Sequence, residues 1–444
     1  MPTQSQTPPS VQSTRHHQIV VVGGGAAGIT ATAQLLASKP SLEIAIIEPS
    51  QKHYYQPGWT LVGGGVFEMA DTERNEKDCI PEGVTWIRDS VVKLEPDDNA
   101  IVTENGLQVT YDYLILCPGI QINWHLIKGL PQALGKGGVT SNYSKEYAPY
   151  TWETLQNFQG GTAIFTFPAT PIKCAGAPQK IMYLADDVFK SKSDVGTRTQ
   201  VMFKDIVRVF KSKSDVGTRT QVMFCNAGAS MFAVPEYRAT LDKIVEERGI
   251  QVKFKHNLKE IKSESREAIF DVTTDDGVEE VSIHYDMIHV APPMSAPDFI
   301  AQSPLASSAG WVDVHRETLQ HNRYANVFSL GDASSLPTSK TAAAIRKQAP
   351  VLVQNLLSAI ESGSQSGEYG GYTCCPLITG YGKTVMAEFD YNLKPTSTFP
   401  FDPSQERYSM WFLKKNVLPW VYWNRMLKGK SFEGDWLQFL KGKS

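Results

Sequence analysis

A single cysteine stands among prolines in the stretch from residue 165 to residue 178, where Cys174 is surrounded by Pro168, Pro171 and Pro178. The stretch follows a β-like run, Thr162–Phe165, where a protein with two nucleotide sites would carry its second glycine-rich phosphate turn. Proline has no backbone N–H and fixes its own φ, so this turn is poorly suited to hold a phosphate. It is suited to hold a thiol in a fixed place, and the stretch therefore indicates thiol chemistry.

A true glycine turn lies near the N-terminus. The β-branched run Gln18–Val22 leads into Gly23-Gly24-Gly25-Ala26-Ala27-Gly28, a helix-like stretch follows, and a second strand-like run ends on Glu48. Gly23 allows the tight turn, Gly25 lets the backbone approach a pyrophosphate, and Gly28 lets helix and strand pack closely. The acid then accepts hydrogen bonds from a ribose hydroxyl. Together these features predict a dinucleotide site, and a glycine turn without a ligand is the less common alternative.

A third pattern combines a strand with an acid. The strand-like run Asn326–Leu330 ends on Gly331-Asp332, which suits a carboxylate that binds the ribityl hydroxyls of a flavin. The following helix is expected to start near Thr341, with Ser339 as its cap. Its N-terminus, with Lys340 beside it, would place positive potential where a reduced flavin carries negative charge. The alternative for Lys340 is a solvated surface lysine.

Two α/β units are needed to position these patterns. We predict an α/β fold with two Rossmann-like domains, of the kind found in flavin disulfide reductases, and a C-terminal amphipathic region for membrane attachment. Residues 1–17 are expected to be a disordered tail. Residues 18–125 and 295–365 form a split FAD-binding domain, residues 126–294 form the second domain with Cys174, and residues 366–444 form the C-terminal region.

The second domain contains an internal duplication. The stretch Val188–Phe203 recurs without a change at Val209–Phe224, 21 residues later. Two copies are too few for a solenoid, which needs at least about three repeats to bury a continuous face. Both copies contain the strand-like Thr-Gln-Val-Met-Phe, but only the second continues into Cys225. We expect one copy to lie in the sheet and the other to form an extra loop or short element.

The C-terminal stretch Asp402–Ser444 interleaves aromatic and basic residues, among them Trp411, Trp420, Trp423 and Lys428. Apolar faces edged by Trp, Lys and Arg suit helices that lie in a membrane interface. The alternative is an amphipathic tail packed on its own core or on a dimer partner. On the first interpretation, removing residues from about 405 onward should release the protein from membranes while FAD stays bound.

Composition excludes several classes of protein. The chain has 444 residues, 41% hydrophobic and 20% charged, which fits folded domains with sizeable cores. A net charge of −3 gives no electrostatic case for nucleic acid. Six cysteines are too few for a secreted disulfide scaffold, and none has zinc-type spacing, so no metal site is predicted. The chain has no apolar run of the roughly 18 residues that a spanning helix needs.

Taken together, these residues give the chain a resemblance to the sulfide:quinone oxidoreductases, particularly the mitochondrial type, over about residues 18–440. The resemblance is carried by Val22–Gly28, His53–Gly63, Phe165–Lys180, Gly331–Ala342 and Tyr372–Tyr381. The duplication departs from the family pattern, and so does the cysteine doublet at 374–375. Cys375 matches the family's second redox cysteine, and Cys374 is an extra thiol that competes for the same role.

The resemblance implies noncovalently bound FAD and a redox pair, Cys174 and Cys375, beside it. The implied FAD residues are Gly23, Gly24, Gly25, Gly28, Glu48, Gln56, Val91, Gly331, Asp332, Lys340, Thr341 and Ala342. A quinone would bind among the C-terminal aromatics and Tyr381, Phe389 and Tyr391.

The implied reaction is the oxidation of hydrogen sulfide. Hydrosulfide attacks the Cys174–Cys375 bridge at Cys375, electrons pass through FAD to ubiquinone or another quinone, and an acceptor such as glutathione or sulfite removes the sulfane sulfur. Peripheral attachment to the mitochondrial inner membrane is implied, and a bacterial cytoplasmic membrane suits the N-terminus equally.

Two rival functions remain open. One is a type II NADH:quinone oxidoreductase, although the prolines around Cys174 argue against its nicotinamide turn. The other is a flavin-binding persulfide carrier or redox scaffold without turnover.

Overall fold

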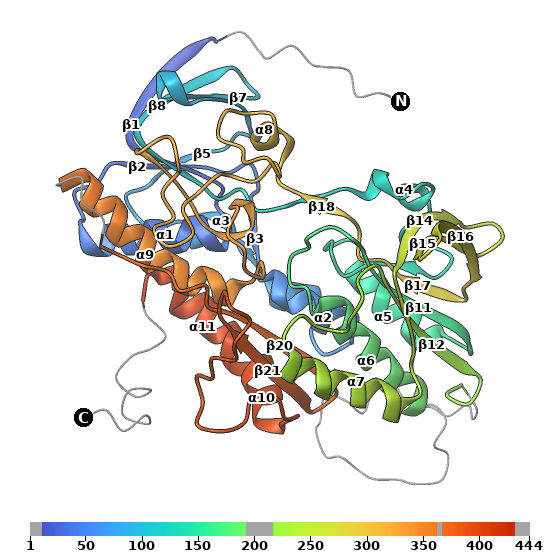
Figure 1. The fold of residues 1–444 in the computed structure, drawn as a ribbon. Coiled ribbons are helices and arrows are strands. Elements are labelled where there is room, and N and C mark those ends of the chain that lie inside the picture. The colour runs from blue at the N-terminus through green and yellow to red at the C-terminus, as the bar shows by residue number, and fades with distance from the viewer. Residues whose placement is uncertain (1–10, 192–215, 362–365, 431–444) are drawn as a thin grey trace.

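The computed structural model describes residues 11–191, 216–361 and 366–430. Within these ranges the chain forms two α/β units, each built on a largely parallel sheet, as the sequence predicted (Figure 1). A β-hairpin from the C-terminal part contacts helices of both units. The arrangement brings segments far apart in sequence to the junction between the two sheets.

The first sheet holds the glycine turn at the end of its central strand. Its strands run in the order β5-β2-β1-β8-β7-β6, and β19 also pairs with β8. Ile19–Val22 of β1 and Ile44–Ile47 of β2 are rich in β-branched residues and fully buried, as parallel strands covered on both faces should be. The strands are β1 (Ser13–Val22), β2 (Ile44–Ile47), β5 (Thr85–Ile87), β6 (Val91–Glu95), β7 (Ala100–Thr103), β8 (Leu107–Leu116) and β19 (Val327–Ser329).

The prediction of a disordered tail over residues 1–17 is wrong for Ser13–His17. These residues extend β1 and pair in parallel with Leu107–Tyr111 of β8. Their side chains are mostly exposed, so the extension depends on the backbone ladder and not on apolar burial. The polar composition of these residues suggested a disordered tail, because composition gives no information about hydrogen bonds between backbones.

Two helices cover the glycine-turn end of this sheet and contact each other, α1 (Ala26–Ser38) and α9 (Ala342–Glu361). Thr341 caps α9, because its Oγ1 accepts a hydrogen bond from the backbone N–H of Ala344 at 3.1 Å. The expectation that Ser339 is the cap is therefore wrong. The backbone carbonyl of Ser339 instead accepts a hydrogen bond from the Thr373 hydroxyl.

The second sheet is parallel throughout, in the order β10-β17-β11-β12-β13. An antiparallel sheet of β14, β15 and β16 follows β13 in the chain. The strands are β10 (Val139–Thr140), β11 (Gly161–Phe167), β12 (Thr220–Asn226), β13 (Gln251–Phe254), β14 (His256–Lys262), β15 (Glu267–Thr274), β16 (Gly277–His284) and β17 (Met287–His289). The main helices of this unit are α5 (Ala148–Asn157), α6 (Ala177–Ser191) and α7 (Pro235–Arg248).

The second copy of the duplicated stretch supplies β12, which pairs with β11 and β13. The first copy begins inside α6, whose last residues are Val188–Ser191. Its strand-like part, residues 199–203, lies outside the described residues. One copy is therefore in the sheet, and the expectation for the other stays a prediction.

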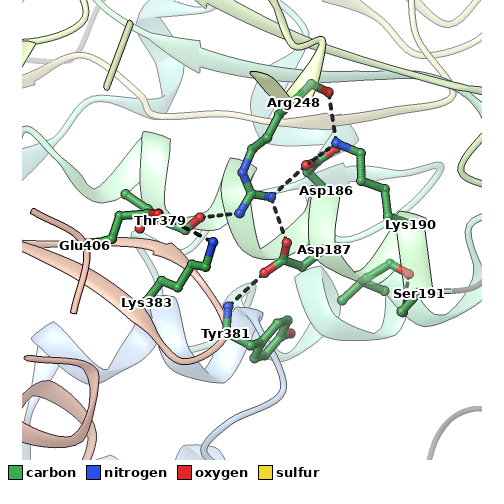
Figure 2. A network of polar contacts seen from close by, with 10 residues as sticks. Asp186, Asp187, Lys190, Ser191, Arg248, Thr379, Tyr381, Lys383 and Glu406 are labelled. Atoms are coloured by element: carbon green, nitrogen blue, oxygen red, sulfur yellow. Dashed lines mark hydrogen bonds and ion pairs between the residues drawn. The ribbon is translucent and has the colours of Figure 1, made fainter. Parts of the chain in front are cut away.

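A polar network joins α6, α7 and the C-terminal hairpin (Figure 2). Arg248, at the end of α7, donates to the carboxylates of Asp186 and Asp187 at 2.8 and 2.7 Å and to the carbonyl of Thr379 at 2.6 Å. Asp187 also accepts the backbone N–H of Tyr381 at 2.8 Å. The network fixes the hairpin strand β20 against α6.

The C-terminal part consists of the hairpin β20 (Thr373–Gly380) and β21 (Lys383–Phe389) and of short helical segments. These are α10 (Tyr408–Phe412), a π-helical turn at Leu413–Val417, and α11 (Leu418–Asn424). Among the helices in the described ranges, none combines the length and apolarity needed to cross a membrane. The other short elements include β3 (Lys52–Tyr54), β4 (Glu73–Asn75), β9 (Gln121–Ile122), β18 (Met294–Ser295), α2 (Trp59–Gly63), α3 (Glu76–Cys79), α4 (Leu130–Ala133) and α8 (Asp298–Ala301).

Candidate functional site

One cavity of about 520 Å³ connects the glycine turn of the first unit with the proline-flanked cysteine of the second. Much of its lining comes from residues that the sequence singled out. These are Gly24, Gly25, Glu48, Gln56, Cys174, Asp332, Lys340, Thr341 and Ala342. Gly23, Gly28, Val91, Gly331 and Cys375 are not part of this lining; Val91 is a buried residue at the start of β6.

Each position of the turn has its own physical reason to be glycine or to tolerate another residue. Gly23 has φ of +104°, a conformation that favours glycine, and a Cβ at Gly28 would lie 2.0 Å from the carbonyl oxygen of Gly23. A Cβ at Gly25 would meet no protein atom within 4 Å. The fold itself therefore does not need glycine at position 25, and the open space there fits the close approach of a ligand's pyrophosphate.

Two carboxylates lie beside this turn, the half-buried Glu48 and the buried Glu76. Glu48 accepts the backbone N–H groups of Gly24 and Ser50, both at 2.8 Å, and burial raises its pKa. Glu76 is 1% exposed, and its Oε1 has no hydrogen-bond partner among the described residues. Both carboxylates line the cavity, where they can accept hydrogen bonds from ribose hydroxyls. Sequence reasoning found Glu48 from its spacing but gave no signal for Glu76.

Asp332 and the start of α9 line another part of the cavity, where the sequence predicted the flavin. Burial raises the pKa of Asp332, although the nearby ammonium groups of Lys340 and Lys173 act in the opposite direction. The Lys340 ammonium donates to the carbonyls of Asp332 and Ser334 at 2.6 and 3.2 Å and lies 3.8 Å from the centroid of the Trp311 ring. Burial lowers its pKa to about 8. Lys340 is therefore not a solvated surface lysine.

The thiol end brings Cys174 and Cys375 together. Their Sγ atoms are 3.7 Å apart, although the residues are 201 positions apart in sequence. Cys174 has φ of +51°, which is uncommon for a residue with a side chain, and its backbone N–H donates to the carbonyl of Lys340 at 2.8 Å. A disulfide requires about 2.05 Å between sulfurs, so a small movement of the side chains joins the pair.

A lysine that the sequence did not indicate completes the thiol end. The Nζ of Lys180, in the first turns of α6, lies 3.1 Å from the Sγ of Cys174, and Lys180 is 3% exposed. The hydrogen bond with Cys375 lowers the pKa of Cys174 most, burial raises it, and the Lys180 ammonium lowers it further. The net result is a pKa well below that of an ordinary thiol. Cys174 is therefore the pair's thiolate.

The pKa of Cys375 moves in the other direction. Its hydrogen bond to the Cys174 sulfur raises it most, and burial raises it further. Burial alone would lower the pKa of Lys180, but the two sulfurs raise it overall, so its ammonium persists. One thiolate, one thiol and one cation thus lie together. Cys174 and Lys180 line the cavity, and Cys375 contacts Cys174 without lining it.

Cys374 lies on the opposite face of β20 from Cys375, because side chains alternate along a strand. Its Sγ contacts the Sδ of Met386 at 3.3 Å and packs in a small cluster with Met410. Burial and the nearby Glu388 raise its pKa well above the usual range. Cys374 lines the cavity, but the thiol in contact with the Cys174 sulfur is that of Cys375.

The C-terminal segment forms one wall of the same cavity, through Leu413, Lys414, Leu418, Val421, Tyr422 and Met426. The Lys414 ammonium donates to the carbonyl of Pro57 at 3.0 Å, and the Tyr422 hydroxyl lies 2.6 Å from Nε2 of His53. The His53 Nδ1 in turn lies 3.3 Å from the Glu76 carboxylate. The expectation that FAD stays bound without residues beyond 405 does not fit this structure, since those residues line the site.

The three residues predicted for the quinone do not form a site. Tyr381 lies at the turn of the β20–β21 hairpin, where its hydroxyl donates to the carbonyl of Gly64, while Phe389 lies at the far end of the hairpin and packs on Phe232. The Tyr391 hydroxyl donates to the carbonyl of Arg316 at 2.7 Å. None of the three lines the large cavity. The prediction was based on aromatic character alone. It could not foresee that the β20–β21 hairpin places Tyr381 and Phe389 at opposite ends.

Comparisons with known proteins agree with this geometry. The family described as pyridine nucleotide-disulphide oxidoreductase matches residues 17–150. The mitochondrial sulfide:quinone oxidoreductase of Mus musculus is 43% identical over 428 residues, which cover 96% of this chain and 90% of that protein. The protein of the same name from Dictyostelium discoideum is 47% identical over 418 residues, 94% of this chain and 87% of its own.

Solved structures support the fold. The sulfide:quinone oxidoreductase from Aquifex aeolicus matches with a TM-score of 0.77 at 17% identity, covering 97% of this chain and 96% of that one. The NDH2 structure from Plasmodium falciparum, solved with NADH, matches with a TM-score of 0.64 at 10% identity, covering 92% of this chain and 98% of its own. At these identities the two structures bear on the fold alone.

Proposed function

The chain belongs to the sulfide:quinone oxidoreductases of the mitochondrial type, and we propose that it oxidises hydrogen sulfide at Cys174 and Cys375 with a quinone as the electron acceptor. The observation that carries this proposal is the thiol pair, whose Sγ atoms are 3.7 Å apart, with the Lys180 ammonium 3.1 Å from Cys174. Cys174 and Lys180 line the same cavity as the glycine turn.

The cofactor is a flavin, and we propose that it is FAD. The turn at Gly24 and Gly25 would hold its pyrophosphate, Glu48 its ribose, and Asp332 with the start of α9 its flavin end. The open space at Gly25 and the unpaired Oε1 of Glu76 favour such a ligand. When bound, FAD supplies two-electron chemistry, taking electrons from the thiol pair and giving them to the quinone.

The protein's own steps begin with the oxidised pair. Hydrosulfide attacks Sγ of Cys375, the bond between the two cysteines breaks, and its electron pair stays on Cys174 as a thiolate. Lys180 stabilises that thiolate, because its buried ammonium lies at hydrogen-bond distance. Attack at Cys375 leaves the better leaving group, since a thiolate of low pKa departs faster. Cys375 then carries the sulfane sulfur as a persulfide, which glutathione or sulfite removes.

We place the quinone against the C-terminal wall and not among Tyr381, Phe389 and Tyr391. This wall contributes apolar side chains to the cavity, namely Phe399, Leu413, Leu418 and Val421. Large exposed apolar side chains occur on the same helical segments, at Tyr408, Phe412 and Trp420. We propose that they dip into the membrane interface, from which a quinone could enter directly. The membrane would be the mitochondrial inner membrane.

Anaerobic addition of sulfide to the FAD-loaded protein tests the proposal. Sulfide is expected to bleach the visible absorbance of the oxidised flavin, and a ubiquinone analogue should restore it. NADH should leave the absorbance unchanged. Bleaching by NADH alone would favour the type II NADH:quinone oxidoreductase instead. Bleaching by sulfide without quinone turnover would favour a persulfide carrier.

A further inference from the structure

Several hydrogen-bonding groups on the cavity wall have no role in the chemistry above. Asn142 and Tyr143 follow β10, and His289 ends β17, so all three lie at the carboxyl edge of the second sheet. Trp59 begins α2 and lines the same cavity. We call these four residues the donor cluster. Each is less than a tenth exposed, at 7%, 5%, 0% and 6% respectively.

The polar atoms of the donor cluster are unpaired within the described chain. They are Nδ2 and Oδ1 of Asn142, the hydroxyl of Tyr143, Nδ1 of His289 and Nε1 of Trp59. A buried polar group without a partner destabilises a fold, so four such residues around one cavity indicate that something else satisfies them. Single unpaired groups occur elsewhere, as in Tyr285, but that residue does not line the cavity. Their gathering around one cavity indicates a polar ligand.

The cluster presents mainly donors. Nε2 of His289 accepts the backbone N–H of Asn142 at 3.0 Å, so the proton of the neutral ring is on Nδ1. Burial lowers the pKa of His289 to about 3, which keeps the ring neutral. Burial and the sulfurs of Cys174 and Cys375 raise the pKa of Tyr143, which keeps its hydroxyl proton. Four donors thus face one acceptor, the amide oxygen of Asn142.

The cluster lies next to the thiols and beside a cation. Tyr143 packs against Ile172 and Ala177, which flank Cys174 in the chain. The Lys173 ammonium lies 5.2 Å from the centroid of the Trp59 ring. A Cβ at Gly63 of α2 would come within 2.3 Å of the Asn142 amide oxygen, so the glycine makes room for this side chain. The geometry favours a small anion with several acceptor atoms.

We propose that the donor cluster binds the sulfur acceptor as an oxyanion of the sulfite type; this inference rests on the proposed function. The three oxygens of sulfite match the three donors of Asn142, Tyr143 and His289, whereas the single sulfur of a thiolate does not. Bound there, the sulfite sulfur attacks the outer sulfur of the Cys375 persulfide. A new sulfur–sulfur bond forms, the bond to Sγ breaks with its electron pair left on Cys375, and thiosulfate departs. No further oxidant is needed.

The test separates acceptor binding from sulfide oxidation. Tyr143→Phe keeps the ring and removes one donor, and Asn142→Asp keeps the shape but adds a negative charge. Both variants, loaded with FAD, should raise the KM for sulfite about tenfold or more, as expected for one lost hydrogen bond to an anion. At saturating sulfite, kcat should stay within about twofold, as should the rate of flavin bleaching by sulfide without acceptor. The KM for glutathione should change far less.

Tyr285→Phe is the matched control, because this buried tyrosine also has an unpaired hydroxyl but lies away from the cavity. It should leave all these constants unchanged. An unchanged KM for sulfite in both variants, or an equal rise in the control, would overturn the proposal. Slower flavin bleaching by sulfide, with an unchanged KM for sulfite, would also overturn the proposal. The donor cluster would then act on the flavin or the thiols and not on the acceptor. If sulfide failed to bleach the flavin in the parent protein as well as in the variants, the proposed function itself would be wrong.

Discussion

The two ends of the cavity are constructed by different means. At the glycine turn, one contiguous stretch of backbone, Gly23–Gly28, forms the site, and each glycine has its own geometric reason. At the thiol end, no stretch suffices: Cys174 and Lys180 come from the second unit, Cys375 from the hairpin and Lys414 from the C-terminal segment. The first kind of site depends on backbone shape and the second on the mutual placement of distant elements.

This difference leads to a clear expectation. A site made by local backbone should be damaged chiefly by changes within its own motif. A site made by convergence should be sensitive to any element that takes part in it. The following predictions test that contrast.

The largest effect is expected at the thiol end. Replacing Cys174 or Cys375 with serine should lower sulfide-dependent quinone reduction by at least about 1,000-fold, because the redox pair is lost. Cys374→Ser should stay within about twofold of the parent, since that thiol lies on the other face of β20. Steady-state reduction of a ubiquinone analogue measures all three. Equal loss in Cys374→Ser would show that the doublet acts as one unit.

Lys180→Met should come next, with a loss of about 100-fold at neutral pH, the effect of a two-unit rise in a thiol pKa. Cys174 is a thiolate above its lowered pKa, so removing the ammonium raises that pKa and moves the acidic limb of the activity profile to higher pH. The deficit should therefore shrink as pH rises. Lys259→Met, an exposed lysine paired with Asp271 and Glu280, is the control and should not shift the profile.

At the glycine-turn end the expected change is in binding. Gly25→Ala should fold normally, because its Cβ meets no protein atom, but should weaken FAD binding about 30-fold by crowding the pyrophosphate. Gly28→Ala should instead fail to fold, since its Cβ would clash with the Gly23 carbonyl. Thermal unfolding with and without FAD distinguishes the two. Normal FAD affinity in Gly25→Ala would contradict the assigned role of the turn.

The features that could be predicted from the sequence are those built by local backbone, and the features that could not are those built by convergence of distant elements. The α/β fold and the glycine turn follow from local patterns, namely buried β-branched strands and glycine spacing. Lys180, Glu76 and Tyr422 could not be found this way, because each reaches the cavity only through packing between elements. Cys375 was reached by family resemblance, since nothing local links it to Cys174. Tyr381, Phe389 and Tyr391 were chosen for aromatic character, and the hairpin separates them.

Variants of the C-terminal segment test whether FAD binding also depends on an element distant from the glycine turn. Tyr422→Phe keeps the ring but removes the contact of 2.6 Å with His53, so FAD should dissociate about fivefold faster, roughly the effect of one hydrogen bond. Removal of residues 406–444 should cause a larger loss of FAD. Fluorescence of released flavin follows both. If the truncated protein retained FAD as well as the parent, residues 406–444 would not contribute to FAD binding.

The smallest effect is expected from the duplication. Deleting residues 188–208 places Val209-Phe210-Lys211-Ser212 directly after Asp187, which reproduces the residues that end α6. Activity should therefore stay within about twofold, because the sequence of α6 is restored and β12 is unchanged. The same quinone assay measures it. A large loss would show that the extra 21 residues take part in the thiol end.

The hydrogen bond from the Cys174 amide to the Lys340 carbonyl ties two parts of the cavity to each other. Lys340 precedes α9 in the first unit, and Cys174 precedes α6 in the second unit. A displacement of the loop before α9 would therefore also displace the backbone of Cys174. The position of the thiolate is in this way set by the first unit as well as by its own.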